Sequence, residues 1–371
     1  MPNRIKFGKW EAVALLINAI STKLYLYYPR MTVEDAGTAG WILSIYVSLV
    51  TLMIFTVLIR LYKRFEGMDI LEVSEICGGK VLKTLTGLIT VGVLFYLTVI
   101  TIREFSEDMK VISLPTSPLS FVMLFFIAGM IIGGFLGLEA IVRYHAILVP
   151  IISIAYILIL IGAVKLMDIS NIYPILGTGA YDIFGKGFFR ISVFGDILML
   201  FLIVPSIGSY KNVKRIGYTA IGFSSVFLTM GSLAYILSFP YPSNLEPFLP
   251  MYQMTRLITY GRFFQRIESV FVFIWATAAL MYLTANFYFM VYVLSRIFDM
   301  KYIRPLIMPC AIIVFSTAFV PQNLVSVLNI ETNIFNKLIW VITFGYVGLI
   351  LIFANLRERA KRRSEKDETE A

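Results

Sequence analysis

Residues 10–29 read WEAVALLINAISTKLYLYYP, and this stretch decides the fold of the chain. The segment is about as long as a helix that crosses a bilayer. However, Asn18 and the run Ser21-Thr22-Lys23 put polar groups where hydrocarbon would surround them. A lysine inside a membrane is costly, so it usually faces protein or water and marks a functional site. We therefore expect a membrane helix that is broken by a polar, functional segment.

The composition is that of a helical protein with many membrane spans. Of 371 residues, 58% are hydrophobic and 15% are charged, and the mean hydropathy is +0.82. With two cysteines and one histidine, a histidine-pair catalyst and a zinc site built on several imidazoles are excluded. We expect no enzyme activity, no cofactor and no metal. The net charge of +9 is attributed to cytoplasmic loops, and no nucleic-acid partner is expected.

The pattern of apolar segments predicts ten membrane spans. If the N-terminus is cytoplasmic, roughly twice as many Lys and Arg residues fall inside as outside, and both termini are then cytoplasmic. A single membrane domain over residues 1–356 is expected, followed by a charged, disordered cytoplasmic tail over residues 357–371. The predicted spans lie near residues 10–28, 39–61, 81–103, 119–138, 142–164, 187–209, 213–237, 266–295, 303–321 and 334–355.

Ten spans can divide into two halves of five. Because five is odd, the halves have opposite orientations, and in transporters of this kind the first helix of each half is interrupted around the substrate. The sixth span carries Gly195-Asp196 and, further on, Pro205, where the lost backbone hydrogen bond is expected to interrupt the helix. We therefore predict an all-α membrane protein of two inverted five-helix repeats, leucine-transporter-like, with helices 1 and 6 interrupted. A simple proline kink in the sixth span is the alternative.

These two irregular spans supply the candidate binding residues. Asp196 is the candidate counter-charge of Lys23. Two other uses of Lys23 remain open: its stem could let the ammonium reach the membrane surface, or the ammonium could stand in for a coupling ion. The predicted site consists of Ala19, Ile20, Ser21, Thr22 and Lys23 from the first span and Asp196, Val204, Pro205, Ser206 and Ile207 from the sixth.

Two further regions are expected to be structured outside the membrane. Residues 62–80 combine acidic and apolar side chains in the pattern of a short amphipathic helix at the interface. Residues 238–265 form a proline-rich outer loop followed by an amphipathic run. Arg262, Arg266 and Glu268 form a charge cluster at the start of the eighth span, which is read either as a helix anchor or as an outer gate or partner contact.

Several short motifs, in this order and spacing, carry a resemblance. They are Gly137-Leu138-Glu139 to Arg143 with Pro150, Tyr173-Pro174-Ile175-Leu176-Gly177, Gly195-Asp196 with Pro205, and Arg262 to Glu268 running into Phe271 to Trp275. Over about residues 8–356, the chain resembles the endospore germination permease family, the membrane B subunits of spore nutrient-germinant receptors. That family lies within the amino acid–polyamine–organocation transporter superfamily.

The resemblance implies a pocket for an amino-acid-sized ligand between helices 1 and 6 and assembly with A and C subunits in the spore inner membrane. The chain departs from the family at Ser21-Thr22-Lys23-Leu24, where relatives often carry a glycine-rich break. Two functions stay open. One is a receptor subunit that senses a small nutrient and helps to trigger germination. The other is a proton- or sodium-coupled transporter of amino acids or amines.

Overall fold

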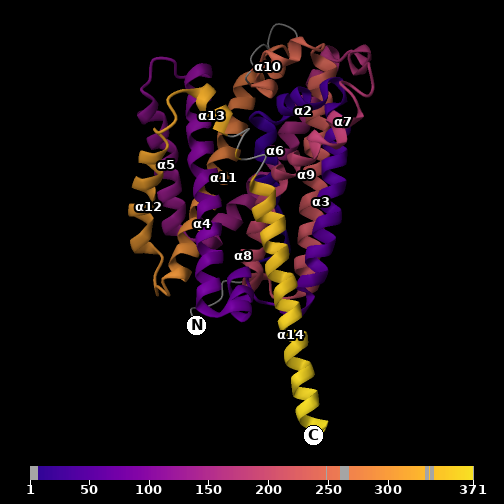
Figure 1. Cartoon of the computed structure of the whole chain (residues 1–371). Coiled ribbons are helices and arrows are strands. Elements are labelled where there is room, and N and C mark those ends of the chain that lie inside the picture. The colour runs from indigo at the N-terminus through magenta and orange to yellow at the C-terminus, as the bar shows by residue number, and fades with distance from the viewer. Residues whose placement is uncertain (1–6, 248, 260–266, 331–333, 335–337, 371) are drawn as a thin grey trace.

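The chain folds into a bundle of helices, described here by a computed structural model (Figure 1). Residues 7–247, 249–259, 267–330, 334 and 338–370 are described, and every regular element among them is helical, as predicted. Within this part of the chain, eight helices are long and apolar enough to cross a membrane. The helices at the predicted first and ninth spans are shorter, with 13 residues and 14 residues. The count of ten membrane spans therefore stays a prediction.

In chain order the helices are α1 (Lys9–Ser21), η1 (Thr22–Tyr25), α2 (Tyr28–Ala36), η2 (Gly37–Ala39), α3 (Gly40–Tyr62), η3 (Lys63–Phe65), α4 (Ile70–Ile112), α5 (Leu119–Leu136), α6 (Leu138–Ala163), η4 (Val164–Leu166), η5 (Ile169–Ile172), α7 (Ala180–Phe184), η6 (Lys186–Ile197), α8 (Leu198–Ile207), α9 (Tyr210–Ser238), η7 (Ser243–Leu245), α10 (Pro250–Arg256), α11 (Ile267–Ile297), α12 (Arg304–Thr317), α13 (Leu324–Ile330), η9 (Val341–Tyr346) and α14 (Val347–Glu370). The η elements are 3₁₀-helices, except η9, which is a π-helix.

The first span is interrupted where the sequence predicts it. Helix α1 ends at Ser21, the chain tightens into η1, and Leu26 leaves helical geometry before α2 begins. All residues from Ala12 to Ser21 are buried, because α1 packs between α6, α9 and α11 in the centre of the bundle. A helix buried on every side has no lipid-facing stripe, which fits its apolar sequence.

The interruption of the sixth span is a change of helix type beside Asp196 rather than a break at Pro205. It begins as η6 and becomes α-helical at Leu198. Pro205 lies within α8, which ends at Gly208 with a φ of 83°, a left-handed conformation that glycine adopts readily. The change of helix type in the sixth span therefore falls beside the acidic residue that was expected to pair with Lys23.

The remaining helices surround this centre in two groups (Figure 1). Helices α5 and α12 lie beside α4 on one side, and α3 and α9 pack against each other on the other side. Helix α10 lies at one end of the bundle, which we call the upper end, and α14 projects from the opposite, lower end. The predicted interfacial helix is present as the start of α4, which is separated from the membrane helix by a kink at Gly78 and Gly79.

The charged tail does not behave as the sequence analysis expects. Residues 357–370, predicted to be disordered, continue α14 as a helix to Glu370. This segment contains no glycine or proline and is rich in Arg, Lys, Glu and Ala, which have high intrinsic helix propensity. A helix that is already nucleated within the bundle extends at little cost through such a sequence.

An ionic cluster joins α4 to α11 at the lower end. Asp69 caps α4, because its side chain accepts from the backbone N–H of Glu72 at 2.8 Å and Glu72 caps Asp69 in return. Arg296 lies 3.1 Å from Asp69 and 3.3 Å from Glu72. Burial raises the pKa of Asp69 to about 6, and this effect outweighs the opposite effect of the positive charge on Arg296.

Close helix contact between α3 and α9 depends on Gly217. A Cβ atom at this position would lie 2.1 Å from the Phe55 ring, and Phe55 is fully buried. We expect Gly217→Ala to destabilise the protein by about 1 to 3 kcal/mol through overpacking. The matched control on the same helix is Gly222→Ala, which meets nothing within 4 Å and gains up to about 1 kcal/mol in helix propensity. Thermal unfolding of the purified variants measures both, and equal melting temperatures would contradict the assigned contact.

The lower-end cluster predicts a pH dependence. The pKa of Asp69 is raised from 3.8 to about 6 in the folded protein, so the folded state binds its proton more tightly than the unfolded chain does. The stability that this provides is complete below about pH 4 and is lost as the pH rises through about 6. The melting temperature of the wild type relative to Asp69→Asn, which keeps a capping side chain, should therefore fall between about pH 4 and pH 6. A difference that stays constant over this range would refute the assignment.

Candidate functional site

The two interrupted spans are joined by a buried ion pair between Lys23 and Asp196. The Lys23 ammonium contacts the Asp196 carboxylate and also donates to the carbonyl oxygen of Val193 at 3.1 Å. The Asp196 side chain is completely buried, and 12% of the Lys23 side chain is exposed. The predicted counter-charge is confirmed, and the ammonium lies in the protein interior rather than at the membrane surface.

A tyrosine from α11 completes this arrangement. The Tyr282 hydroxyl donates to the second carboxylate oxygen of Asp196 at 3.3 Å, and the Lys23 ammonium lies 5.6 Å from the centre of the Tyr282 ring. A cation at this distance is attracted by the ring's electron-rich face. The carboxylate therefore has a cationic partner and a neutral donor, as a buried charge requires.

Hydrogen bonds fix the first span just before its break. Before the break, Asn18 donates from its side-chain amide to the carbonyl of Ala278 on α11 at 3.1 Å. Ser21, the last residue of α1, donates to the hydroxyl of Ser224 on α9 at 3.2 Å. Helix α1 is thus held against two different helices immediately before η1 turns Lys23 towards Asp196.

A second ion pair joins the sixth span to α2, the short helix that follows the first span. Arg190, on η6, donates to the Asp35 carboxylate of α2 at 2.9 Å and through its Nε atom to the other oxygen. The Arg190 residue is 7% exposed. The sixth span is therefore linked by charge to the break in the first span and to α2 beyond it.

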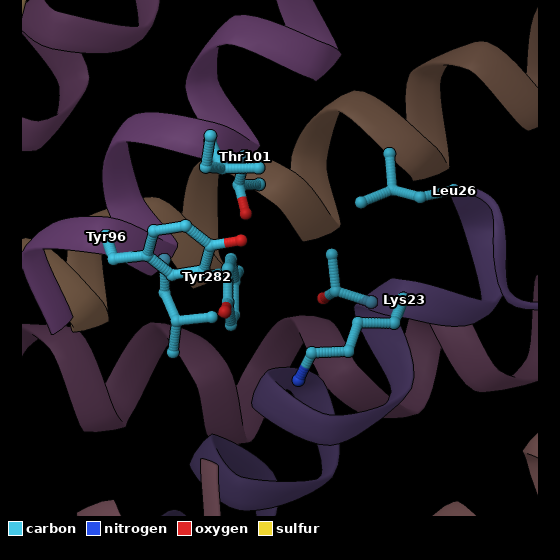
Figure 2. A pocket seen from close by; sticks show the side chains of 8 residues that line it. Lys23, Leu26, Tyr96, Thr101 and Tyr282 are labelled. Carbon is cyan, nitrogen blue, oxygen red and sulfur yellow. The ribbon is translucent and has the colours of Figure 1, made fainter. Parts of the chain in front are cut away.

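A small pocket lies beside the ion pair (Figure 2). Side chains from the first span, α4 and α11 converge on it. Its free volume is about 10 Å³, close to the least that holds one water molecule. A nutrient molecule would therefore need the pocket to open. The lining residues are Thr22, Lys23, Leu26, Tyr96, Leu97, Ile100, Thr101 and Tyr282.

Three of the ten predicted site residues lie at the pocket or its ion pair. Thr22 and Lys23 line the pocket, and Asp196 holds Lys23. Ala19 and Ile20 are buried in α1, and Ser21 bonds to α9. The run Val204, Pro205, Ser206 and Ile207 is outside the lining and lies at the end of α8, with Pro205 about 13 Å along the helix from Asp196. Whether any of these residues binds a ligand stays a prediction.

The sequence analysis missed the contribution of the third and eighth spans. Tyr96 and Thr101 come from α4, and Tyr282 comes from α11. In two halves of five spans, the third and eighth spans are equivalent, just as the first and sixth are. This symmetry, applied to the hydroxyl-bearing residues in the middle of these spans, was the signal that could have found them. Arg262 and Arg266 of the predicted charge cluster lie outside the described residues, and Glu268 is the second residue of α11.

The match to a family model decides the classification. The model for a spore germination protein matches residues 9–327, which include the interrupted spans, the pocket and α11. The chain belongs to this family. It is 22% identical to spore germination protein B2 of Bacillus subtilis (strain 168) over 213 residues, 57% of each chain. It is 23% identical to spore germination protein A2 of the same organism over 287 residues, 73% of this chain and 75% of the relative.

Solved structures establish the fold. The chain is similar to MhsT in complex with L-phenylalanine, with a TM-score of 0.68 at 15% identity, over 95% of this chain and 89% of that one. It is also similar to a Na⁺-coupled sialic acid symporter, with a TM-score of 0.67 at 12% identity, over 95% of this chain and 79% of that one. The predicted all-α, leucine-transporter-like fold is confirmed, whereas the count of ten spans stays a prediction. The protein is an integral, multi-pass membrane protein. The family model describes a spore germination protein, and one of these two similar structures is a symporter.

The burial of the Lys23–Asp196 pair predicts strong coupling in a double-mutant cycle. Removing one partner leaves the other charge buried, so Lys23→Ala and Asp196→Asn should each cost about 3 to 5 kcal/mol. The double variant should cost much less than the sum of the two. The matched control is the pair of Lys186 with Asp182, in which 60% of the lysine side chain is exposed and coupling below about 1 kcal/mol is expected. Additive effects at Lys23 and Asp196 would show that the pair does not form.

Proposed function

We propose that this protein is a B-type membrane subunit of a spore germinant receptor that binds a small, amino-acid-like nutrient between its first and sixth spans. The observation that carries the proposal is the Lys23–Asp196 pair, which joins the two interrupted spans beside the pocket. Membership of the spore germination protein family supports the biological role. The transporter fold supports a ligand site at the breaks.

The ion pair suggests how such a ligand is received. An amino acid carries a carboxylate and an ammonium, so it can replace each partner of the pair, with its carboxylate on Lys23 and its ammonium on Asp196. This exchange leaves no buried charge unpaired, whereas a ligand with only one charge would do so. Leu26, Leu97 and Ile100 provide apolar contact for a side chain.

Ligand entry then changes the distance between the first and sixth spans. The pocket as described is too small for an amino acid, so binding selects an arrangement in which the first and sixth spans are further apart at their breaks. A ligand that binds only this open arrangement shifts the equilibrium towards it. In a receptor, that shift is the signal that contributes to triggering germination. We further propose that the partners that receive it are the receptor's A and C subunits, and that the complex lies in the spore inner membrane with both termini of this chain in the cytoplasm.

The alternative function is a proton- or sodium-coupled secondary transporter of amino acids or amines. The similarity in fold to MhsT and to the sialic acid symporter favours it. The pocket itself does not separate the two functions, because a carrier and a sensor need the same one. Reconstituted vesicles separate the two functions. Uptake of labelled amino acid that stops when the ion gradient is collapsed would establish a transporter, whereas binding without uptake supports the sensor.

The proposed site predicts a selective loss of ligand response. A thermal-shift panel of amino acids, sugars and nucleosides on the purified wild type first identifies a ligand, and we expect an amino acid to raise the melting temperature. Lys23→Ala should weaken its apparent affinity by about 30-fold or more, since truncating one member of a buried charge pair costs about 2 kcal/mol or more. The control Lys186→Ala removes an exposed lysine that is also paired with an aspartate, and it should leave the affinity unchanged. If Lys23→Ala responds at wild-type concentrations, the pocket lies elsewhere.

A further inference from the structure

Two oxygen-bearing groups on η6 hold the Lys23 ammonium. They are the main-chain carbonyl of Val193 and the carboxylate of Asp196, which are three residues apart on η6. The Tyr282 hydroxyl steadies the carboxylate from the other side. Among the described residues that line the pocket, none is acidic. We call Val193, Asp196 and Tyr282 the seat of the ammonium; Asp196 gives it a negative charge, which the ammonium of Lys23 balances.

Oxygen atoms of this kind, gathered where a membrane helix is broken, are those that hold small monovalent cations in membrane proteins. A carboxylate that is completely buried stays ionised only if a positive partner lies against it. A free ion could supply that charge. In this chain, a side chain supplies it instead, because η1 places Lys23 opposite η6.

We propose that Val193, Asp196 and Tyr282 form a monovalent-cation site in which the ammonium of Lys23 is a tethered substitute for a free ion. It follows that the wild-type protein binds neither Na⁺ nor K⁺ at this position and needs neither to keep its interrupted spans together. Shortening Lys23 to alanine leaves Asp196 without its partner and opens the space that the lysine stem filled. The variant should then take up a small cation at the site that the wild type fills by itself.

The experiment measures cation dependence without any nutrient ligand. Wild type and Lys23→Ala are heated in solubilised membranes as fluorescent fusions, and the monodisperse fraction gives a melting temperature. The salts are NaCl, KCl, n-propylammonium chloride and N-methyl-D-glucamine chloride at equal ionic strength. The n-propylammonium ion has the three carbons and the charged nitrogen that alanine lacks relative to lysine. Neutral 1-propanol provides the same carbon chain without the charge.

We expect the melting temperature of the wild type to be equal in all four salts. Lys23→Ala should melt lower than the wild type in N-methyl-D-glucamine chloride. It should regain several degrees, in a saturable manner, with Na⁺, K⁺ or n-propylammonium, but not with 1-propanol.

Two variants show whether the effect belongs to this site. Lys23→Ala combined with Asp196→Asn removes the negative charge and should lose all cation dependence. Lys23→Met keeps a long stem in the space but has no charge, so it should be destabilised and should not be restored by any cation. Together these variants separate ion binding at the seat from a general effect of salt.

Three results would overturn the proposal. The first is a saturable stabilisation of the wild type by Na⁺ or K⁺ that Asp196→Asn abolishes. The second is a Lys23→Ala variant that is monodisperse in none of the salts. The third is a response of Lys23→Ala to cations that stays the same when Asp196→Asn is added. The proposal concerns the same site as the function proposed above. Because the cation experiment uses no nutrient, failure of the cation-site proposal would not contradict the proposed function. Likewise, a failed nutrient screen would not contradict the cation site.

Discussion

The structure depends on a charge that has to be satisfied inside a membrane protein. Asp196 is buried completely, and a carboxylate in that position keeps its charge only if a cation and hydrogen-bond donors reach it. Lys23 provides the cation and Tyr282 provides the donor. These residues come from three elements far apart in the sequence, so the need to satisfy one carboxylate brings the first span, the sixth span and α11 to a common point.

Both spans lose regular α-helical geometry where they meet. In η1 and η6 the backbone is wound more tightly than in an α-helix, and such 3₁₀ segments inside longer helices often mark functional hinges. The carbonyl of Val193 is turned to the Lys23 ammonium at this place. The contacts between the two spans thus put the charges of Lys23 and Asp196 beside the small pocket. A ligand could compete for them there.

The sequence was sufficient to predict the fold class, the break in the first span and the Lys23–Asp196 pair, because each follows from the cost of polar groups in hydrocarbon. The break in the sixth span was tied to Pro205, yet the change of helix type lies at Asp196. A proline near the end of a helix removes a hydrogen bond without breaking the element, and the difference depends on tertiary contacts that a sequence pattern does not contain. Tyr96, Thr101 and Tyr282 were missed for a similar reason: in a buried membrane helix, a hydroxyl that faces a pocket and one that bonds to its own helix look alike. The tail was predicted to be disordered from its charge pattern, but it forms the end of α14, because its residues have high helix propensity.

The central claim is that Lys23 and Asp196 form a direct ion pair within the membrane domain. Solid-state NMR on protein in lipid bilayers, with dipolar recoupling between the labelled lysine Nζ and aspartate Cγ atoms, measures this most directly. The resonances are assigned to this pair by their loss in Lys23→Met and in Asp196→Asn. The account predicts a separation within about 4 Å, as in a direct ion pair. Full signal intensity without dephasing at this site, which indicates a separation well beyond contact, would contradict it.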